Sequence, residues 1–319
     1  MMDCTDRHER YFLRLLSKNV MLYTEMVATK SAIHGNRKKI LGFSEAEKPV
    51  ALQVGGSNKN ELSEVCKIAE EMGYDEININ LGCPSKKVQK NKFGACLIKE
   101  PDLVAECINK MVNSCKIPVT AKTRIGFDQT ESFDYLNLFV NKISNAGAKT
   151  IILHARKAIL KGLTPKENLK IPKLNYPMVY EIKKHNKNLE IIINGGIVNC
   201  SQIKEHLNNC DGVMIGRAIY QNPYFLAEIE KTFFNNTNIP TRSEIAEKLV
   251  EYVKDEVKKG TRINQIMRHT VGLYHGQNGA NKWKRYLSDN MMARNSDFQK
   301  VNHIMEIVQN NEKSNQTAS

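Results

Sequence analysis

Cys83 is the residue of this sequence best suited to acid or nucleophile chemistry. It lies between Gly82 and Pro84 at the end of a β-branched run, where a tight turn holds a side chain in a rigid, exposed position. Four lysines follow it within ten residues, and residues 77–99 contain no acid. Such a positive field suits an anionic substrate and is expected to lower the pKa of the thiol. The alternatives are a buried structural cysteine here, or Cys96 as the reactive thiol.

Polar or glycine-rich groups also stand at the ends of the other β-branched runs. In chain order they are Gln53, Asn80, Lys122, His154, Asn194 with Gly195 and Gly196, and Gly216 with Arg217. In a parallel barrel the carboxyl ends of the strands share one face, so these groups form one ring. The late glycines let backbone N–H groups approach a phosphate, and Arg217 adds charge. The pattern suits FMN or a sugar phosphate, with Lys122 and His154 as candidates for contacting a ring or stabilising an anion.

The elements that position this ring alternate between two patterns. Short β-branched runs cover residues 20–27, 50–54, 77–81, 119–124, 150–154, 189–194 and 212–216. Between them, apolar residues recur with helical spacing, as at 62–69 and 103–111. This alternation predicts an α/β protein with a parallel sheet. Seven regularly spaced strands, with no G-x-G-x-x-G after an early one, favour a (β/α)₈ TIM barrel over a Rossmann sheet.

The first strand of such a barrel is missing from this sequence. The chain opens on a helical stretch, residues 6–17, with no strand before it. Either the barrel is incomplete, or the recorded start lies downstream of the true one, which we favour. A real truncation would leave a strand edge unpaired and weaken cofactor binding.

The strand signals stop after residue 235. Residues 241–259 combine an N-cap at Thr241 or Ser243 with an apolar face and Gly260 as C-cap, which predicts a helix. Further helices are expected over residues 261–274, 280–287 and 296–308. We therefore predict a barrel domain over residues 1–236, a small helical domain over 237–311 and a disordered tail over 312–319.

The net charge of +13 favours a polyanionic partner. Two basic stretches, residues 156–173 and 258–285, contribute to it, and the aromatics Tyr274, Trp283 and Tyr286 are interleaved with the second. Lysine and arginine can bind phosphates while aromatic rings stack on unpaired bases, although a merely solvated helix face is the alternative. No apolar run is long enough for a membrane helix, no signal peptide is present, and no cysteine pair has C-x-x-C spacing. We expect a cytoplasmic protein without membrane or metal binding.

A series of motifs runs in order along nearly the whole chain. They lie at residues 2–8, 23–26, 50–56, 73–85, 88–89, 93–97, 118–126, 154–158, 162–168, 193–197, 211–217, 268–269 and 283–287. In combination they resemble the tRNA-dihydrouridine synthases, and most of all the bacterial A subfamily. This sequence differs in two ways: relatives begin with a strand ending in Ala-Pro-Met, and Cys4 stands where they usually carry Trp.

The resemblance implies an FMN-dependent barrel with a helical tRNA-binding domain, expected as a monomer. NADPH would reduce the flavin, and the flavin would reduce a D-loop uridine at positions 20 and 20a of tRNA. Cys83 would be the general acid that protonates C5 of the uracil. Gln53, Lys122 and His154 would hold the isoalloxazine, and Asn194, Gly195, Gly196, Gly216 and Arg217 the FMN phosphate. The tRNA contacts would be Asn80, Arg156, Lys166, Arg268, Lys284 and Arg285.

Two other functions stay open at this point. One is an FMN barrel that reduces a small molecule, such as a dihydroorotate or enoate reductase. The other is a tRNA-binding protein that the missing strand has made inactive. The basic stretches and C-terminal helices argue against a small substrate, which has no need of them.

Overall fold

The structure is a computed structural model that describes residues 1–291 of the 319-residue chain. The helix predicted over residues 296–308 and the tail predicted over 312–319 lie outside the described residues. The chain divides into two compact units. The barrel unit comprises Met1–Met2, Met21–Phe43 and Pro49–Ile215, and the helical unit comprises Asp3–Val20, Ser44–Lys48 and, of the described residues, 216–291.

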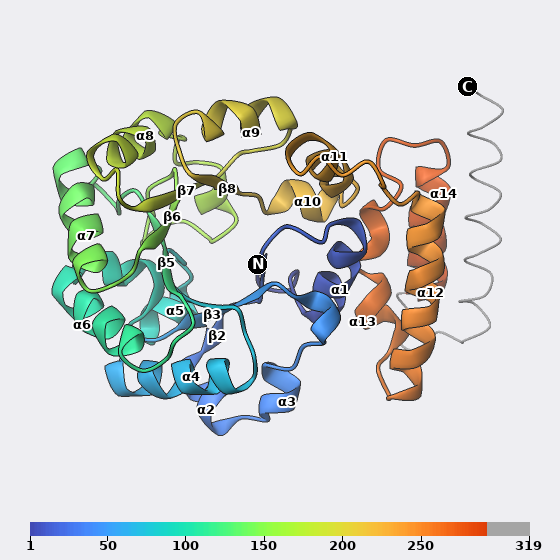
Figure 1. Ribbon diagram of the computed structural model, residues 1–319, viewed down its shortest axis with the longest axis horizontal. Helices are drawn as coiled ribbons and strands as arrows, with labels where there is room; N and C mark the ends of the chain where they lie inside the picture. The colour runs from blue at the N-terminus through green and yellow to red at the C-terminus, as the bar shows by residue number, and fades with distance from the viewer. Residues whose placement is uncertain (292–319) are drawn as a thin grey trace. The chain divides into compact units, whose positions relative to one another are not determined.

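The barrel unit is built on one parallel sheet. Its strands are β1 (Leu22–Tyr23), β2 (Val27–Ala28), β3 (Val50–Gly55), β4 (Glu76–Leu81), β5 (Val119–Arg124), β6 (Thr150–His154), β7 (Glu190–Asn194) and β8 (Gly212–Met214). The order is β1-β3-β4-β5-β6-β7-β8, and β2 also pairs with β3. The sheet curls, and helices lie around its outer side (Figure 1). This TIM-barrel-like arrangement confirms the predicted α/β fold class.

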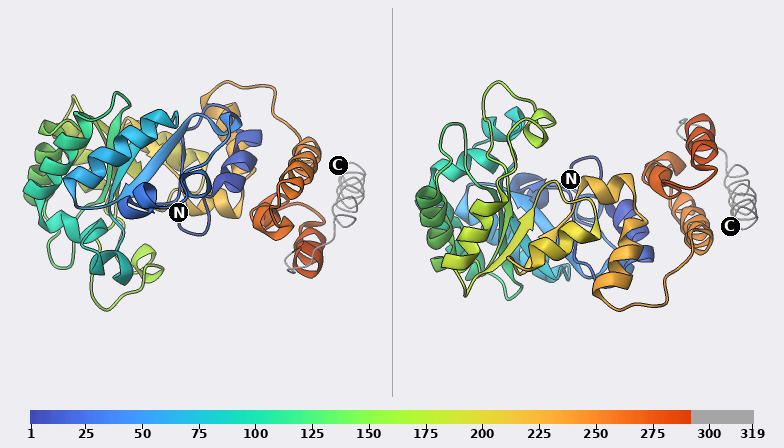
Figure 2. Two further views of the ribbon diagram at one scale, coloured as in Figure 1. Left: turned by 90° about the horizontal axis from the view of Figure 1, so that it is seen from below. Right: turned by 90° about the horizontal axis from the view of Figure 1, so that it is seen from above.

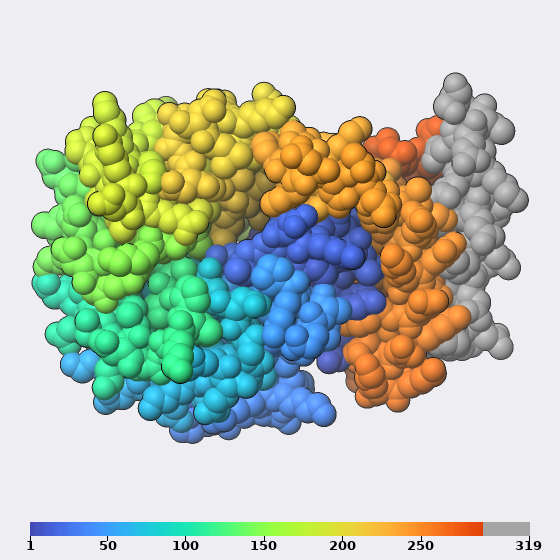
Figure 3. Space-filling model, in the orientation of Figure 1, coloured from blue at the N-terminus to red at the C-terminus, as the bar shows by residue number. Residues whose placement is uncertain are grey.

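The helices of the barrel unit connect successive strands. They are α2 (Thr29–His34), α3 (Arg37–Ile40), α4 (Lys59–Glu71), α5 (Lys86–Lys90), α6 (Pro101–Val112), α7 (Phe133–Asn145), α8 (Tyr176–His185) and α9 (Cys200–Leu207), with short 3₁₀ helices η2 (Gly94–Lys99) and η3 (Glu167–Leu169). The predicted apolar face of α4 is buried at Leu62, Val65, Cys66 and Ala69. Figure 3 shows side chains of the barrel unit packed against one another on the face turned to the viewer. Because helices cover it, the sheet is apolar on that face, as parallel sheets are.

The strand predicted over residues 20–27 is interrupted. β1 pairs Tyr23 with Ala51, whereas β2 pairs Val27 with Val54, so three residues oppose two on β3. This is a β-bulge. The Thr24 hydroxyl oxygen accepts from the Gln53 N–H at 2.9 Å, which satisfies the backbone group that the bulge leaves without a ladder partner.

The sheet does not close in the part of the chain that the structure describes. No strand precedes α1 (Arg7–Leu16) there, and no pairing joins β8 to β1. The order therefore ends at β1 on one side and at β8 on the other.

The helical unit combines α1 with the C-terminal helices. These are α10 (Arg217–Gln221), α11 (Phe225–Phe233), α12 (Arg242–Lys258), α13 (Ile263–Met267) and α14 (Ala280–Tyr286), with η1 (Glu45–Glu47), η4 (Thr270–Gly272) and a π-helical turn η5 (Leu287–Met291). Thr241 caps α12 in a capping box with Glu244, which resolves the predicted choice in favour of Thr241. Arg10 forms a buried ion pair with Glu47 at 2.8 Å. The boundary predicted after residue 236 divides the sequence into a barrel domain and a helical domain, and it stays a prediction.

Among residues 1–291, no helix has both the length and the apolar character needed to cross a bilayer.

Candidate functional site

The backbone of Cys83 is held from both sides. The Asn80 Oδ1 atom accepts from the N–H groups of Gly82 at 3.1 Å and Cys83 at 3.0 Å. The Cys83 carbonyl accepts from the Ala95 N–H at 2.9 Å. Gly94, at φ +76°, packs so closely that a Cβ there would lie 2.6 Å from the Cys83 oxygen. Cys83 therefore stands on a rigid turn at the carboxyl end of β4, as predicted, but it is half-buried where the sequence predicted an exposed position.

Gln53 and Asn80 form a hydrogen-bonded pair across the ends of neighbouring strands. The Asn80 Nδ2 atom donates to Gln53 Oε1 at 2.9 Å, and Gln53 Nε2 donates to Asn78 Oδ1 at the same distance. Gln53 lies opposite Asn78 in the register of β3 and β4. The structure therefore brings together Gln53 and Asn80, which the sequence placed in one ring, and it adds Asn78.

Lys122 reaches across β6 to Asn194 on β7. Its Nζ donates to Asn194 Oδ1 at 3.1 Å, and Asn194 Nδ2 donates to the Met214 carbonyl at 2.7 Å. Desolvation lowers the pKa of Lys122 to about 8, and the neighbouring Arg124 charge acts in the same direction. The bond to Asn194 is the main hydrogen bond of this ammonium in the described residues, so the group can also bind a hydrogen-bond acceptor or an anion of a ligand.

Gly195 and Gly196 form a turn that excludes side chains. They have φ +118° and +76°, and a Cβ on Gly195 would lie 2.8 Å from the His154 ring. The Tyr176 hydroxyl donates to the Gly195 carbonyl at 2.7 Å. Glycines at these two positions leave a cradle beside His154 that a Cβ would fill, and such a close backbone approach is what a phosphate group needs, so these residues fit FMN.

Gly216 and Arg217 belong to the helical unit. Gly216 is the N-cap residue of α10, and Arg217 begins that helix directly after β8. Their predicted share in a phosphate site stays a prediction.

Arg124 is a site residue to which the sequence analysis gave no role. Its Nε donates to the Gly82 carbonyl at 3.0 Å, and Nη1 donates to the carbonyls of Lys157 at 3.1 Å and Asn168 at 3.0 Å. It thus ties the Cys83 turn to the segment after β6. Desolvation lowers the pKa of Arg124 to about 10. The available signal was its position two residues after Lys122, which puts both side chains on one face of the strand.

The basic segment after β6 is fixed from inside. The buried Asn168 side chain bonds both the N–H and the carbonyl of Ile159, at 2.8 and 2.9 Å. Arg156 donates to the Pro172 carbonyl, while Lys166 is exposed. Gln89 of α5 donates to the Leu160 carbonyl at 3.0 Å. Figure 2 shows the segment projecting from the sheet beside α5, so an ordered frame presents its lysines outward.

Comparisons with known proteins show which family this chain is similar to. The family described as "Dihydrouridine synthase (Dus)" matches residues 1–311. The chain is 49% identical to a Synechocystis protein named tRNA-dihydrouridine(20/20a) synthase, over 92% of this chain and 88% of that one. It is 46% identical to the protein of the same name from Escherichia coli K12, over 97% and 90% of the two chains.

The chain belongs to the dihydrouridine synthase family.

The resemblance stated from the sequence is therefore confirmed, and with it the prediction of an enzyme, since dihydrouridine synthases are oxidoreductases. Among solved structures, a histamine dehydrogenase from Rhizobium sp. 4-9 is similar with a TM-score of 0.53 at 12% identity, over 71% of this chain and 44% of that chain. At that identity the similarity supports the fold alone.

The cationic residues of the helical unit that were predicted to contact tRNA differ in their exposure and in their ion pairs. Lys284 and Arg285 are exposed on α14, and Arg285 lies 3.6 Å from Asp289. Arg268 instead forms an ion pair with Asp6 at 2.6 Å. These three stay predictions as tRNA contacts.

The aromatics expected to stack on bases are partly a wrong prediction. Tyr274 and Trp283 are each 1% exposed and form part of the core. The centroids of their rings lie 5.4 Å apart in an edge-to-face contact. The Trp283 Nε1 atom donates to the Thr270 carbonyl at 2.9 Å. Burying a large aromatic ring in the core of the helical unit stabilises the folded protein more than leaving the ring exposed to solvent.

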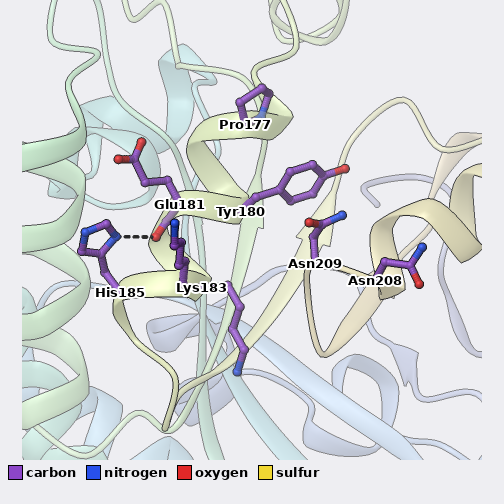
Figure 4. Close-up of a pocket in the computed structure, with 8 residues that line it drawn as sticks. Pro177, Tyr180, Glu181, Lys183, His185, Asn208 and Asn209 are labelled. Carbon is purple, nitrogen blue, oxygen red and sulfur yellow. Dashed lines mark hydrogen bonds between the residues drawn. The ribbon is translucent and has the colours of Figure 1, made fainter.

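An open depression of about 520 Å³ lies away from the ring of polar groups at the strand ends. Figure 4 shows it on the outer side of α8 and the turn after α9, and its lining includes Tyr180, Lys183, His185 and Asn209. It lies in the helical layer and contains none of the ring residues, so it takes no part in the proposed chemistry.

Proposed function

We propose that this chain reduces uridine in tRNA to 5,6-dihydrouridine, at D-loop positions 20 and 20a, with FMN bound in the barrel unit and NADPH as electron donor. The rigid Cys83 turn beside Lys122, Asn194 and the Gly195 turn carries the proposal. The relatives named tRNA-dihydrouridine(20/20a) synthase support the substrate and the positions.

Cys83 acts as the general acid. Saturating the C5–C6 double bond of uracil takes a hydride at C6 and a proton at C5, and FMN, when bound, supplies the hydride. The Cys83 S–H group gives its proton to C5 and is left as a thiolate, which water or buffer then reprotonates. Carbon takes protons slowly from water, and a thiol fixed within reach of C5 removes that barrier by proximity.

The ring residues divide between the two parts of FMN. Gln53, Lys122 and His154 hold the isoalloxazine, and the Lys122 ammonium stabilises negative charge on it. Asn194, Gly195 and Gly196 bind the phosphate through side-chain and backbone N–H groups, with Gly216 and Arg217 completing that site.

The tRNA is held by cations outside the ring. Asn80 contacts the target uracil, which leaves its stack to enter the site. Arg156, Lys166, Arg268, Lys284 and Arg285 contact phosphates, and residues 237–311 act as the tRNA-binding domain. The net charge of +13 supports this, and so do the four exposed lysines of the segment after β6, namely Lys161, Lys166, Lys170 and Lys173. A tRNA substrate is also the reason to propose a cytoplasmic location.

The test begins with the purified chain, which is expected to carry flavin absorbance. Incubation with NADPH and unmodified tRNA should give dihydrouridine, detected by nucleoside mass spectrometry, and mapping should place it at positions 20 and 20a. The Cys83→Ala protein should keep FMN and lose tRNA reduction, and Cys96→Ala is the matched control. Full dihydrouridine formation by Cys83→Ala would overturn the role of the thiol.

Two outcomes favour the other functions. Reduction of free uridine or orotate without tRNA would indicate a small-molecule reductase. Binding of tRNA by a colourless protein that takes up no FMN would indicate a non-catalytic tRNA-binding protein.

A further inference from the structure

A single route of hydrogen bonds runs through the inside of the barrel unit from Cys83 to a buried acid. It starts with the Cys83 N–H, which donates to Asn80, and continues from Asn80 to Gln53 and from Gln53 to Asn78. Asn78 Nδ2 then donates to the Thr120 hydroxyl at 2.8 Å, and that hydroxyl donates to Glu76 Oε1 at 2.5 Å. We call these five bonds the amide chain.

The direction of the amide chain is fixed by chemistry. A backbone N–H can only donate, so the Asn80 oxygen must face Cys83 and its NH₂ group must face Gln53. The same reasoning orients Gln53 and then Asn78. Thr120 accepts from Asn78, so its proton must go to Glu76. Every side chain in the route thus has one orientation that satisfies both neighbours.

Glu76 is the terminal acceptor of the amide chain. It is 8% exposed, and its Oε1 also accepts from the Tyr23 hydroxyl at 2.8 Å. A carboxylate accepts without donating, so it favours the observed direction over its reverse. Burial, together with the charge of Glu190, raises the pKa of Glu76 above its usual value, although the bonds from Thr120 and Tyr23 oppose that rise. Bonds aligned in a low-dielectric interior polarise one another, so the far end affects the near end.

We propose that Glu76 is a positioning residue, which holds the Cys83 turn and the Gln53 carboxamide in their working orientation through the amide chain. The catalytic part of this inference rests on the proposed function. Glu76 touches neither the substrate nor the reacting atoms, and it acts through Thr120, Asn78, Gln53 and Asn80.

The sharpest variant is Thr120→Val, which keeps the shape of the side chain and removes the hydroxyl link. Thr120→Ser restores that link and should rescue the effect. Thr123→Val is the matched control, because Thr123 is buried on the same strand and lies on the other face. Glu76→Met removes the terminal acceptor, whereas Glu76→Gln keeps an oxygen there.

The first readout needs no cofactor or substrate. Hydrogen exchange of the Gly82 and Cys83 amides, followed by mass spectrometry of the peptide, reports the bonds to Asn80 directly. We expect roughly tenfold faster exchange in Thr120→Val and Glu76→Met, the usual scale for one buried hydrogen bond. Thr120→Ser, Glu76→Gln and Thr123→Val should exchange within about twofold of the native protein on that scale.

The second readout separates positioning from general stability. In Thr120→Val, reoxidation by tRNA should slow by roughly tenfold because it needs Cys83, whereas flavin reduction by NADPH, which does not use Cys83, should slow by less. Native exchange and native reoxidation in folded Thr120→Val and Glu76→Met would overturn the proposal. If the native protein fails to reduce tRNA, the proposed function fails, and the exchange experiment still decides whether Glu76 holds the turn.

Discussion

The Lys122 Nζ atom lies 3.1 Å from Asn194 Oδ1, with β6 between the strands that carry the two residues. This bond connects the part of the ring assigned to the isoalloxazine with the part assigned to the phosphate. It is the main bond of the Lys122 ammonium in the described residues, and the pKa of that group falls to about 8 because it is desolvated.

Lys122 should make the stability of the apoprotein depend on pH. Its folded pKa of about 8 lies below the ordinary 10.5, so the unfolded state binds the proton more tightly between these values. The charged lysine therefore costs stability below pH 8, and the cost of about 3 kcal/mol disappears as the pH rises towards 10.5. Urea denaturation should show that, from pH 7 to pH 10, the free energy of unfolding of the native protein rises relative to that of Lys122→Met. Lys110→Met, at an exposed position, should follow the native curve, and parallel curves for Lys122→Met would contradict the assignment.

Tyr176 should support FMN binding without touching FMN. Its hydroxyl donates to the Gly195 carbonyl at 2.7 Å and so fixes the turn that we propose binds the FMN phosphate. Tyr176→Phe should raise the Kd for FMN by roughly tenfold, the effect of one hydrogen bond, as measured by quenching of flavin fluorescence. Tyr180→Phe is the control, since its hydroxyl bonds to His206 on the same helix layer. Equal FMN affinities of Tyr176→Phe and Tyr180→Phe would show that the Tyr176 hydroxyl does not support FMN binding.

The ring at the strand ends could be predicted because it depends on strand order and on local sequence. Each of these groups follows a β-branched run, and parallel strands bring their carboxyl ends to one face. The amide chain could not be predicted, because it depends on the register of three strands, in which Gln53 lies opposite Asn78 and Asn80 lies opposite Lys122. A slip of one residue would turn these side chains to the helical layer. Nothing local in the sequence excludes such a slip.

The clamp made by Arg124 was missed for a related reason. Its acceptors are backbone carbonyls of Gly82, Lys157 and Asn168, and carbonyls carry no signature in a sequence. The prediction for Tyr274 and Trp283 was wrong for a different reason. In a sequence, an aromatic residue among lysines has the same pattern whether its ring is buried or exposed. Only packing distinguishes the two cases.

Asp6 should be a stabilising residue of the helical unit. One oxygen caps α1 through the N–H groups of His8 and Glu9, and the other accepts from Arg268 at 2.6 Å and His269 at 3.0 Å. Burial raises the pKa of Asp6, but the bonds and charge of His269, with Arg268, outweigh it and hold the pKa below its usual range. Asp6→Asn keeps a capping oxygen and loses the ion pair, at a cost of about 2 kcal/mol. Asp6→Ala loses the cap as well, which adds about 1 kcal/mol.

The pH dependence provides the check on Asp6. A carboxyl whose folded pKa is depressed contributes its stability above the unfolded value of 3.8, and this contribution is lost as the pH falls towards the folded pKa. Denaturation curves should therefore show native protein and Asp6→Asn converging below pH 3.8. A gap of constant size between the two proteins would mean that packing, and not charge, explains the loss.

Gly195 and Gly162 together test why the turn after β7 needs glycine. Both have positive φ, +118° and +88°, so alanine is strained at either position. At Gly162 nothing lies within 4 Å of an added Cβ, whereas at Gly195 the Cβ would lie 2.8 Å from the His154 ring and 3.1 Å from Leu174. Gly162→Ala should cost only the backbone strain, about 1 kcal/mol in thermal denaturation. Gly195→Ala should cost roughly 2 kcal/mol more, because His154 must move, and it should also abolish FMN retention on gel filtration. Retained FMN in Gly195→Ala would show that neither the His154 position nor the close backbone approach matters for the cofactor.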